Sequence, residues 1–200
     1  MGNIKSTIDS YMKELDELIS KGNLEEAKTK FVKYENELKH TGSEDKKAEI
    51  INILIDFLEP ETKKNLKNYI WNLRSSDRIY LLFKEIYEEK LLASCNFEFT
   101  ALSKEKEINE YIEKTQKVFN LIGLVSKVSV INERLSNLYF KLVDIKYQKI
   151  MNNPKLDEIE EIISLQEKCL QYIKNTINTE QTEEYQKFLV ELLNIKYKLL

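Results

Sequence analysis

The chain is poor in the residues that interrupt helices. Its 200 residues include four glycines and two prolines, against roughly 7% and 5% in average proteins. Sheet proteins need such residues at frequent turns, and no stretch here shows the strict apolar–polar alternation of a half-buried strand. We therefore expect an all-α fold of about nine helices.

Histidine is nearly absent, and this excludes several classes of helical metalloenzyme. His40 is the only histidine, so a di-iron bundle, a His-Glu-x-x-His zinc site and a histidine–aspartate phosphohydrolase site cannot form. We expect His40 to cap the C-terminal end of a helix. The chain also lacks a glycine-rich phosphate loop, and we expect no metal and no other cofactor.

Cysteine and arginine are scarce as well. Cys95 and Cys169 are far apart, and no secretory signal is recognisable. In such a chain we expect two buried thiols rather than a disulfide, and a cytoplasmic, intracellular protein. Three arginines stand beside abundant lysine, asparagine and isoleucine, a bias typical of an AT-rich genome.

The chain has no excess of positive charge. Lysine and arginine number 31, aspartate and glutamate 34, and the net charge is −3. The densest basic spots, at residues 63–67 and 104–106, are interleaved with or flanked by acids. A nucleic-acid binder would show a basic stripe, so we expect no nucleic-acid partner.

The most apolar run of the chain lies between Val118 and Ile150. Apolar residues recur every three or four positions, as on one face of a helix, and we expect a kink or tight turn at Gly123. Between Val118 and Ile131 only Lys127 is charged, so we expect a core helix buried on several sides. A membrane span needs about 20 mostly apolar residues, and this stretch is shorter.

The positions of helix-capping and helix-ending residues predict antiparallel helical hairpins. Gly22 suits a left-handed helix end between a first helix, capped by Asn3 or Ser6 and ending near Ile19, and a second helix capped by Asn23. A helix from Pro60 is expected to place Tyr69 and Leu73 on one inner face. The last helix is expected to be capped by Asn178 or Thr179 and to continue to the end of the chain. Such hairpins would stack as an irregular helical repeat or a multi-helix bundle.

The same pattern suggests how these hairpins are grouped. Residues 1–200 are expected to form a single all-helical domain. Residues 94–101 are its least helical stretch, and we interpret them as a connection between two possible lobes, 1–93 and 102–200.

The first hairpin, within residues 8–40, contains Gly22, Ala27 and Phe31. This spacing resembles one unit of the tetratricopeptide repeat, in which Gly lies in the turn, a small Ala lets the helices approach, and an aromatic follows four residues later. Leu15 and Tyr34 depart from the family, which has small residues there, and no second copy follows at a period near 34 residues. The resemblance implies stacked helical hairpins and peptide binding in a concave groove.

One short cluster has the composition of a partner-binding site. It holds the only Trp and two of the three Arg, residue types that are enriched at binding hot spots because they bury much area and still offer polar contacts. The predicted partner-binding residues are Asn68, Tyr69, Trp71, Asn72, Arg74 and Arg78.

The leading functional hypothesis is a non-enzymatic scaffold or adaptor that binds another protein or a peptide. No catalytic residue is assigned, and the pattern leaves the oligomeric state open. One alternative is a small membrane-tethered regulator, because Gly2 and Ser6 fit the N-myristoylation pattern. A membrane would be a partner only if Gly2 is acylated.

Another alternative is a Mg²⁺-dependent hydrolase that uses Glu-x-x-Glu pairs. This spacing places two carboxylates on one helix face, but no Glu precedes an Asp by three residues to complete a facing motif. The simpler interpretation is a solvated helix face. Such pairs include Glu14/Glu17, Glu85/Glu88 and Glu158/Glu161.

Overall fold

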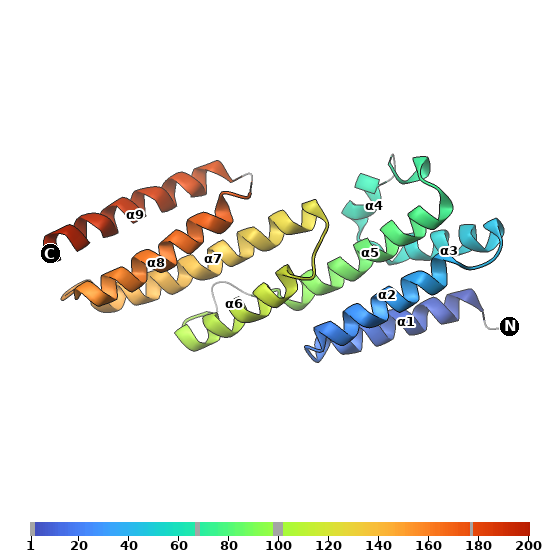
Figure 1. Ribbon diagram of the computed structural model, residues 1–200, viewed down its shortest axis with the longest axis horizontal. Helices are drawn as coiled ribbons and strands as arrows, with labels where there is room; N and C mark the ends of the chain where they lie inside the picture. Colours follow the sequence, from blue (N-terminus) through green and yellow to red (C-terminus); the bar gives the residue numbers. More distant parts are fainter. Residues whose placement is uncertain (1–2, 67–68, 98–101, 177) are drawn as a thin grey trace. The chain divides into compact units, whose positions relative to one another are not determined.

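The computed structural model describes residues 3–66, 69–97, 102–176 and 178–200. Over these residues the chain is helical and contains no strand, as predicted (Figure 1). It divides into two compact units, Met1–Ser94 and Cys95–Leu200. The boundary between them falls within residues 94–101, the segment interpreted as a connection.

The N-terminal unit is organised around one long helix. Its elements are α1 (Ile4–Ser20), α2 (Leu24–Lys39), α3 (Glu44–Phe57), α4 (Pro60–Leu66), the 3-10 helix η1 (Ile70–Asn72) and α5 (Ser75–Ser94). The helix α5 packs against α1, α2 and α3. It can do so because buried apolar side chains lie on more than one of its faces: Ile79, Phe83 and Ile86 share one face, and Leu91 and Leu92 lie on others.

The turn between α1 and α2 is a complete Schellman motif. Gly22 has a φ of 77°, in the left-handed region that glycine adopts without steric cost. Its N–H donates to the carbonyl of Ile19 at 3.0 Å, and the N–H of Asn23 donates to the carbonyl of Leu18 at 2.9 Å. The predicted left-handed helix end at Gly22 is confirmed.

The predicted helix from Pro60 to Leu73 is shorter than expected. It ends at Leu66, and η1 forms a separate turn farther on. Tyr69 is 55% exposed, so its predicted place on an inner face is wrong, whereas Ile70 is buried. Asparagines are frequent in this stretch, and their amides compete for backbone groups and disfavour helix interiors.

The C-terminal unit is a row of antiparallel helices. It contains α6 (Glu105–Phe119), α7 (Val125–Ile150), α8 (Leu156–Ile173) and α9 (Thr179–Leu199). Each of these helices packs against the next one in the chain, and α7, α8 and α9 lie side by side (Figure 1). The core between them includes Leu138, Leu142, Ile159, Ile162 and Leu192.

The apolar run between Val118 and Ile131 is divided between two helices. The predicted break at Gly123 is confirmed, since α6 ends before it and α7 begins after it. The expectation of a helix buried on several sides is wrong here, because Val125 is 86% and Val130 is 39% exposed. Once the run is split, each helix buries only one face, and the burial of α7 begins at Ile131.

Three smaller expectations are also tested. Cys95 and Cys169 are both buried and unbridged, as predicted. His40 occupies the C-cap position of α2, where its Nδ1 lies 2.8 Å from the carbonyl oxygen of Asn36. No helix among the described residues combines the length and the apolar character needed to cross a membrane.

Candidate functional site

A groove with an aromatic floor runs between α7 and α9 in the C-terminal unit. The rings of Phe140 and Tyr185 stack with centroids 4.4 Å apart. Phe188 meets Phe140 edge-on at 6.3 Å and Tyr147 edge-on at 5.3 Å. Aromatic pairs in these geometries attract one another beyond their burial, so the four rings join the two helices along this floor.

Helical periodicity places these side chains on facing surfaces. On α7, Phe140, Asp144, Tyr147 and Met151 follow one another at intervals of three or four residues, which lines one face. On α9, Tyr185 and Phe188 do the same. Because α8 runs between α7 and α9 in the opposite direction, α7 and α9 are parallel, and their successive turns face each other along the groove.

The groove consists of two hollows that share Phe140. One hollow, of about 490 Å³, is lined by Asn96, Phe97, Arg134, Asn137, Phe140, Gln181, Glu184 and Tyr185. The other, of about 620 Å³, is lined by Phe140, Asp144, Tyr147, Gln148, Met151 and Phe188. Along α7 the lining extends from Arg134 to Met151, about 26 Å at 1.5 Å per residue.

An amide network fixes one end of the groove. The Nε2 of Gln181 donates to the Oδ1 of Asn137 at 2.7 Å and to the hydroxyl of Tyr185 at 2.6 Å. That hydroxyl in turn donates to the Oδ1 of Asn137 at 3.3 Å. Burial raises the pKa of Tyr185, which therefore remains a neutral phenol. The amide nitrogen of Asn137 has no partner among the described residues and is left as a donor for a ligand.

The rim of the groove carries carboxylates. Glu184 has no hydrogen-bond or ion-pair partner in the described part of the chain. Asp144 accepts a single hydrogen bond, at 2.9 Å, from Gln148 on its own helix. Arg134 donates to the Sγ of Cys95 at 3.4 Å. The unpaired acidic groups therefore give the rim a preference for cationic ligand groups.

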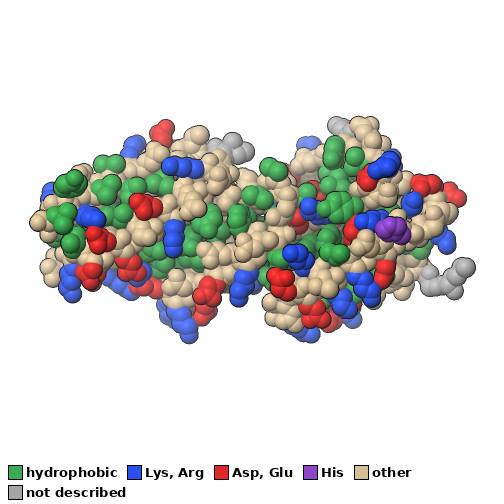
Figure 2. Space-filling model, viewed as in Figure 1, with side chains coloured by type: hydrophobic (Ala, Val, Ile, Leu, Met, Phe, Trp, Pro, Cys, Tyr) green, Lys and Arg blue, Asp and Glu red, His purple; other side chains and the backbone are tan. Residues whose placement is uncertain are grey.

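The surface of this unit combines apolar and charged areas. On the face shown in Figure 2, hydrophobic side chains gather in a band along the C-terminal unit, with Lys, Arg, Asp and Glu beside them. An apolar band of this kind on a protein surface is a common mark of an interaction site.

Of the six predicted partner-binding residues, called here the Trp71 cluster, the structure brings Trp71 and Arg78 into contact. Trp71 is 52% exposed, and the guanidinium carbon of Arg78 lies 5.1 Å from the centre of its ring. The Nε of Arg78 donates to the carbonyl of Leu73 at 2.7 Å, and its Nη2 donates to that of Trp71 at 3.1 Å. Arg78 thus stabilises the turn after η1, and its Nε and Nη2 are already engaged in hydrogen bonds within the N-terminal unit.

The remaining members of that cluster do not converge on a site. Arg74 pairs with Asp77 on its own helix at 2.9 Å, while Tyr69 and Asn72 are exposed. Asn68 lies outside the described residues, as does Gly2, the predicted lipidation site.

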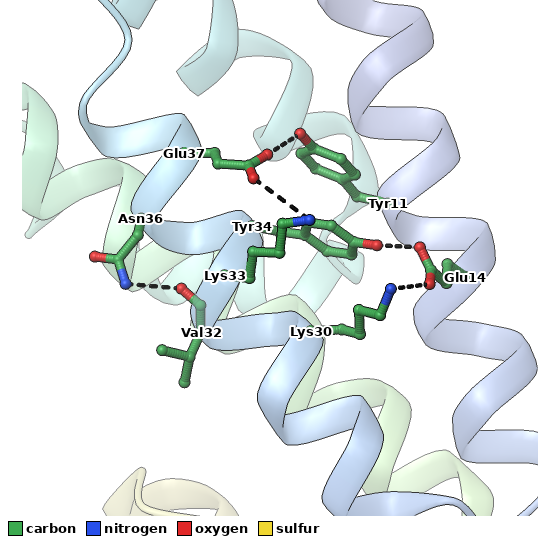
Figure 3. Close-up of polar contacts among 8 residues, drawn as sticks. All are labelled: Tyr11, Glu14, Lys30, Val32, Lys33, Tyr34, Asn36 and Glu37. Carbon is green, nitrogen blue, oxygen red and sulfur yellow. Dashed lines mark hydrogen bonds and ion pairs between the residues drawn. The ribbon is translucent and has the colours of Figure 1, made fainter.

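The hairpin of α1 and α2 carries a reciprocal polar cluster (Figure 3). The Tyr34 hydroxyl on α2 donates to Glu14 on α1, and the Tyr11 hydroxyl on α1 donates to Glu37 on α2. The Nζ of Lys30 lies 2.6 Å from Glu14. Hydrogen bonds from Lys30 and Tyr34 hold the pKa of Glu14 below its usual value. Because every one of these contacts joins α1 to α2, we assign the cluster to the stability of the hairpin.

The Glu-x-x-Glu pairs differ in their surroundings. Glu14 is held as described above, and Glu161 lies 3.0 Å from Lys146. Glu85 and Glu88 are buried, so their interpretation as a solvated face is wrong; α5 is covered by three helices, and Glu88 lies 4.0 Å from Lys84. No three metal-binding side chains come together within the described ranges.

Sequence reasoning missed the α7–α9 groove. The signal was present, because Phe140 and Tyr147 are seven residues apart and share a helix face, as do Gln181 and Phe188. The pairing of these two faces depends on α8 lying between them, and no local pattern encodes it.

Comparisons with protein-family models, with curated proteins and with solved structures gave no match for this chain. The geometry of the groove is therefore the basis on which a function is proposed.

Proposed function

We propose that this chain is a non-enzymatic recognition module, a scaffold or adaptor, that binds an amphipathic helix of another protein in the α7–α9 groove. The observation that supports the proposal is the aromatic floor along the length of the groove. Phe140, Tyr147 and Phe188 are each only partly buried by the unit's own core, so they retain apolar area that a partner can cover.

A helix is the ligand that fits the shape of this site. The groove lies between two parallel helices that both pack on α8, so a further helix placed there would complete a four-helix arrangement. Helical walls offer few free backbone groups for pairing with an extended peptide, whereas apolar side chains spaced i, i+3, i+4 and i+7 can pack into such a groove. Its length of about 26 Å corresponds to about five helical turns.

The charge of the rim specifies the partner further. Glu184 and Asp144 flank the aromatic floor, and both are available to cations. We therefore propose that the bound helix carries Lys or Arg beside its apolar stripe.

A displayed library of helical peptides of about 20 residues, selected against the full chain, tests this proposal. Selected peptides are expected to combine an apolar stripe with flanking Lys or Arg. In fluorescence anisotropy, Met151→Asp and Glu184→Lys should each weaken their binding by about tenfold. Val32→Asp is the matched control, because Val32 is also exposed but lies on α2 in the other unit. Binding that is equally strong in all three variants would refute the proposal.

A further inference from the structure

The outer face of α9 presents an apolar stripe that the C-terminal unit does not cover. The stripe consists of Val190, Leu193, Tyr197 and Leu200, which are 56%, 39%, 79% and 80% exposed. The intervals of three, four and three residues place them on one helix face. Leu200 follows the last residue of α9, but its N–H still donates to the carbonyl of Lys196, so it continues that face.

This stripe is separate from the α7–α9 groove. Phe188 lines the groove, and Val190 lies two residues later, about 200° around the helix. Leu192, which is buried, belongs to the face that packs on α8. The groove and the stripe therefore occupy opposite flanks of α9.

The spacing of the stripe is symmetric about residue 195. When two such helices pack antiparallel across a twofold axis at this point, Val190 of one copy lies opposite Leu200 of the second copy. Leu193 of one copy likewise lies opposite Tyr197 of the second. All four side chains find apolar partners, which is the self-complementarity that an isologous contact requires.

Charges beside the stripe fit the same arrangement. Glu191 and Lys198 are seven residues apart and lie on one flank of the stripe, and neither has a partner in the part of the chain that is described. In an antiparallel pair, equivalent flanks meet, so Glu191 of each copy lies opposite Lys198 of the other. A parallel pair would set them against the other flank, where Lys196 already lies 2.7 Å from Glu160.

We infer that two copies of this chain associate through an antiparallel contact between their α9 helices, centred near residue 195. The contact spans residues 190–200 of each copy, about 16 Å of helix. A contact of this length falls at the small end of specific interfaces, so the dimer forms and dissociates with concentration.

Sedimentation velocity of the full chain, from about 5 µM to about 500 µM, tests this inference. The sedimentation coefficient is expected to rise with concentration, and Tyr197→Glu, a change at an exposed position, should abolish the rise. Met151→Glu is the matched control, because it alters an exposed apolar residue of the groove and should leave association intact. It also separates this inference from the proposed function.

Charge reversal identifies the partner as a second copy in antiparallel orientation. Glu191→Lys and Lys198→Glu each set like charges opposite one another, so either variant alone should associate about tenfold more weakly. When the two variants are mixed in equal amounts, each mixed dimer again has opposite charges at positions 191 and 198 across both pairs, so the mixture should associate like the wild type. A chain that remains monomeric at every concentration, or a mixture that shows no recovery, would overturn the inference and leave the stripe to a different protein.

Discussion

The Tyr11 and Tyr34 rings stack face to face between α1 and α2, with centroids 3.8 Å apart and planes 5° from parallel. Each hydroxyl donates to a glutamate on the opposite helix (Figure 3). The hairpin is therefore stabilised by two hydrogen bonds between α1 and α2, in addition to the burial of its apolar residues.

Removing one tyrosine hydroxyl should destabilise the chain at Tyr34 and stabilise it at Tyr87. Both rings are buried. Tyr34 donates to Glu14, so Tyr34→Phe should lower the free energy of unfolding by about 1 kcal/mol. The buried hydroxyl of Tyr87 has no hydrogen-bond partner among the described residues, so Tyr87→Phe should raise the free energy of unfolding by about 1 kcal/mol. Urea unfolding measures both changes, and two changes of the same sign would contradict this assignment.

The stability of the N-terminal unit should fall between about pH 10 and about pH 12. Burial raises the pKa of Tyr11 from 10.0 to about 12, and its hydrogen bond to Glu37 adds to the shift. Burial likewise raises the pKa of Tyr87 to about 12. In this window the unfolded chain loses protons that the folded chain keeps, which favours unfolding.

The contribution of Tyr11 can be isolated from that of Tyr87. The contribution of these two tyrosines to the free energy of unfolding should be constant below about pH 10 and should decline above it. Tyr11→Phe should make the decline shallower. A decline of unchanged slope in that variant would show that Tyr11 titrates alike in both states.

Two glycine substitutions should have opposite effects. No side chain would meet a Cβ within 4 Å at either Gly22 or Gly42, so only the backbone differs between the two sites. Gly22 has a positive φ, and Gly22→Ala should lower the melting temperature, at a cost of about 1 kcal/mol. Gly42→Ala restricts only the unfolded chain and should leave stability unchanged or raise it by about 0.5 kcal/mol. Calorimetry of both variants provides the comparison.

Two residues of the Trp71 cluster, Arg78 and Trp71, should differ in how much they contribute to stability. Arg78 donates to two backbone carbonyls, so Arg78→Ala should destabilise the N-terminal unit by about 1 kcal/mol. Trp71 is half exposed, and Trp71→Ala should change stability by less than about 0.5 kcal/mol. If binding of a partner is lost in Trp71→Ala alone, the predicted partner site belongs to Trp71 rather than to Arg78.

Sequence patterns predicted the all-helical fold and two of its turns. Gly22 identified the first turn, because only a left-handed residue satisfies both helix ends there. The break at Gly123 was also predicted, and α6 ends before it while α7 begins after it.

The errors arose where burial depends on neighbouring helices. Val125 is as apolar as Ile131, yet only Ile131 is covered. Glu85 and Glu88 look solvated in sequence but are buried on α5, against which three helices pack. The groove at Phe140 and the stripe on α9 are likewise products of which helices pack against each other, and periodicity alone carries no information about that choice.

Both cysteines of the chain, Cys95 and Cys169, belong to the C-terminal unit and are buried, and Cys169 lies in the core between its helices. Burial raises the pKa of the Cys169 thiol, which suppresses its reactive thiolate. A thiol reagent therefore modifies Cys169 only when this unit opens. The rate of alkylation at Cys169 would thus follow the opening of the C-terminal unit.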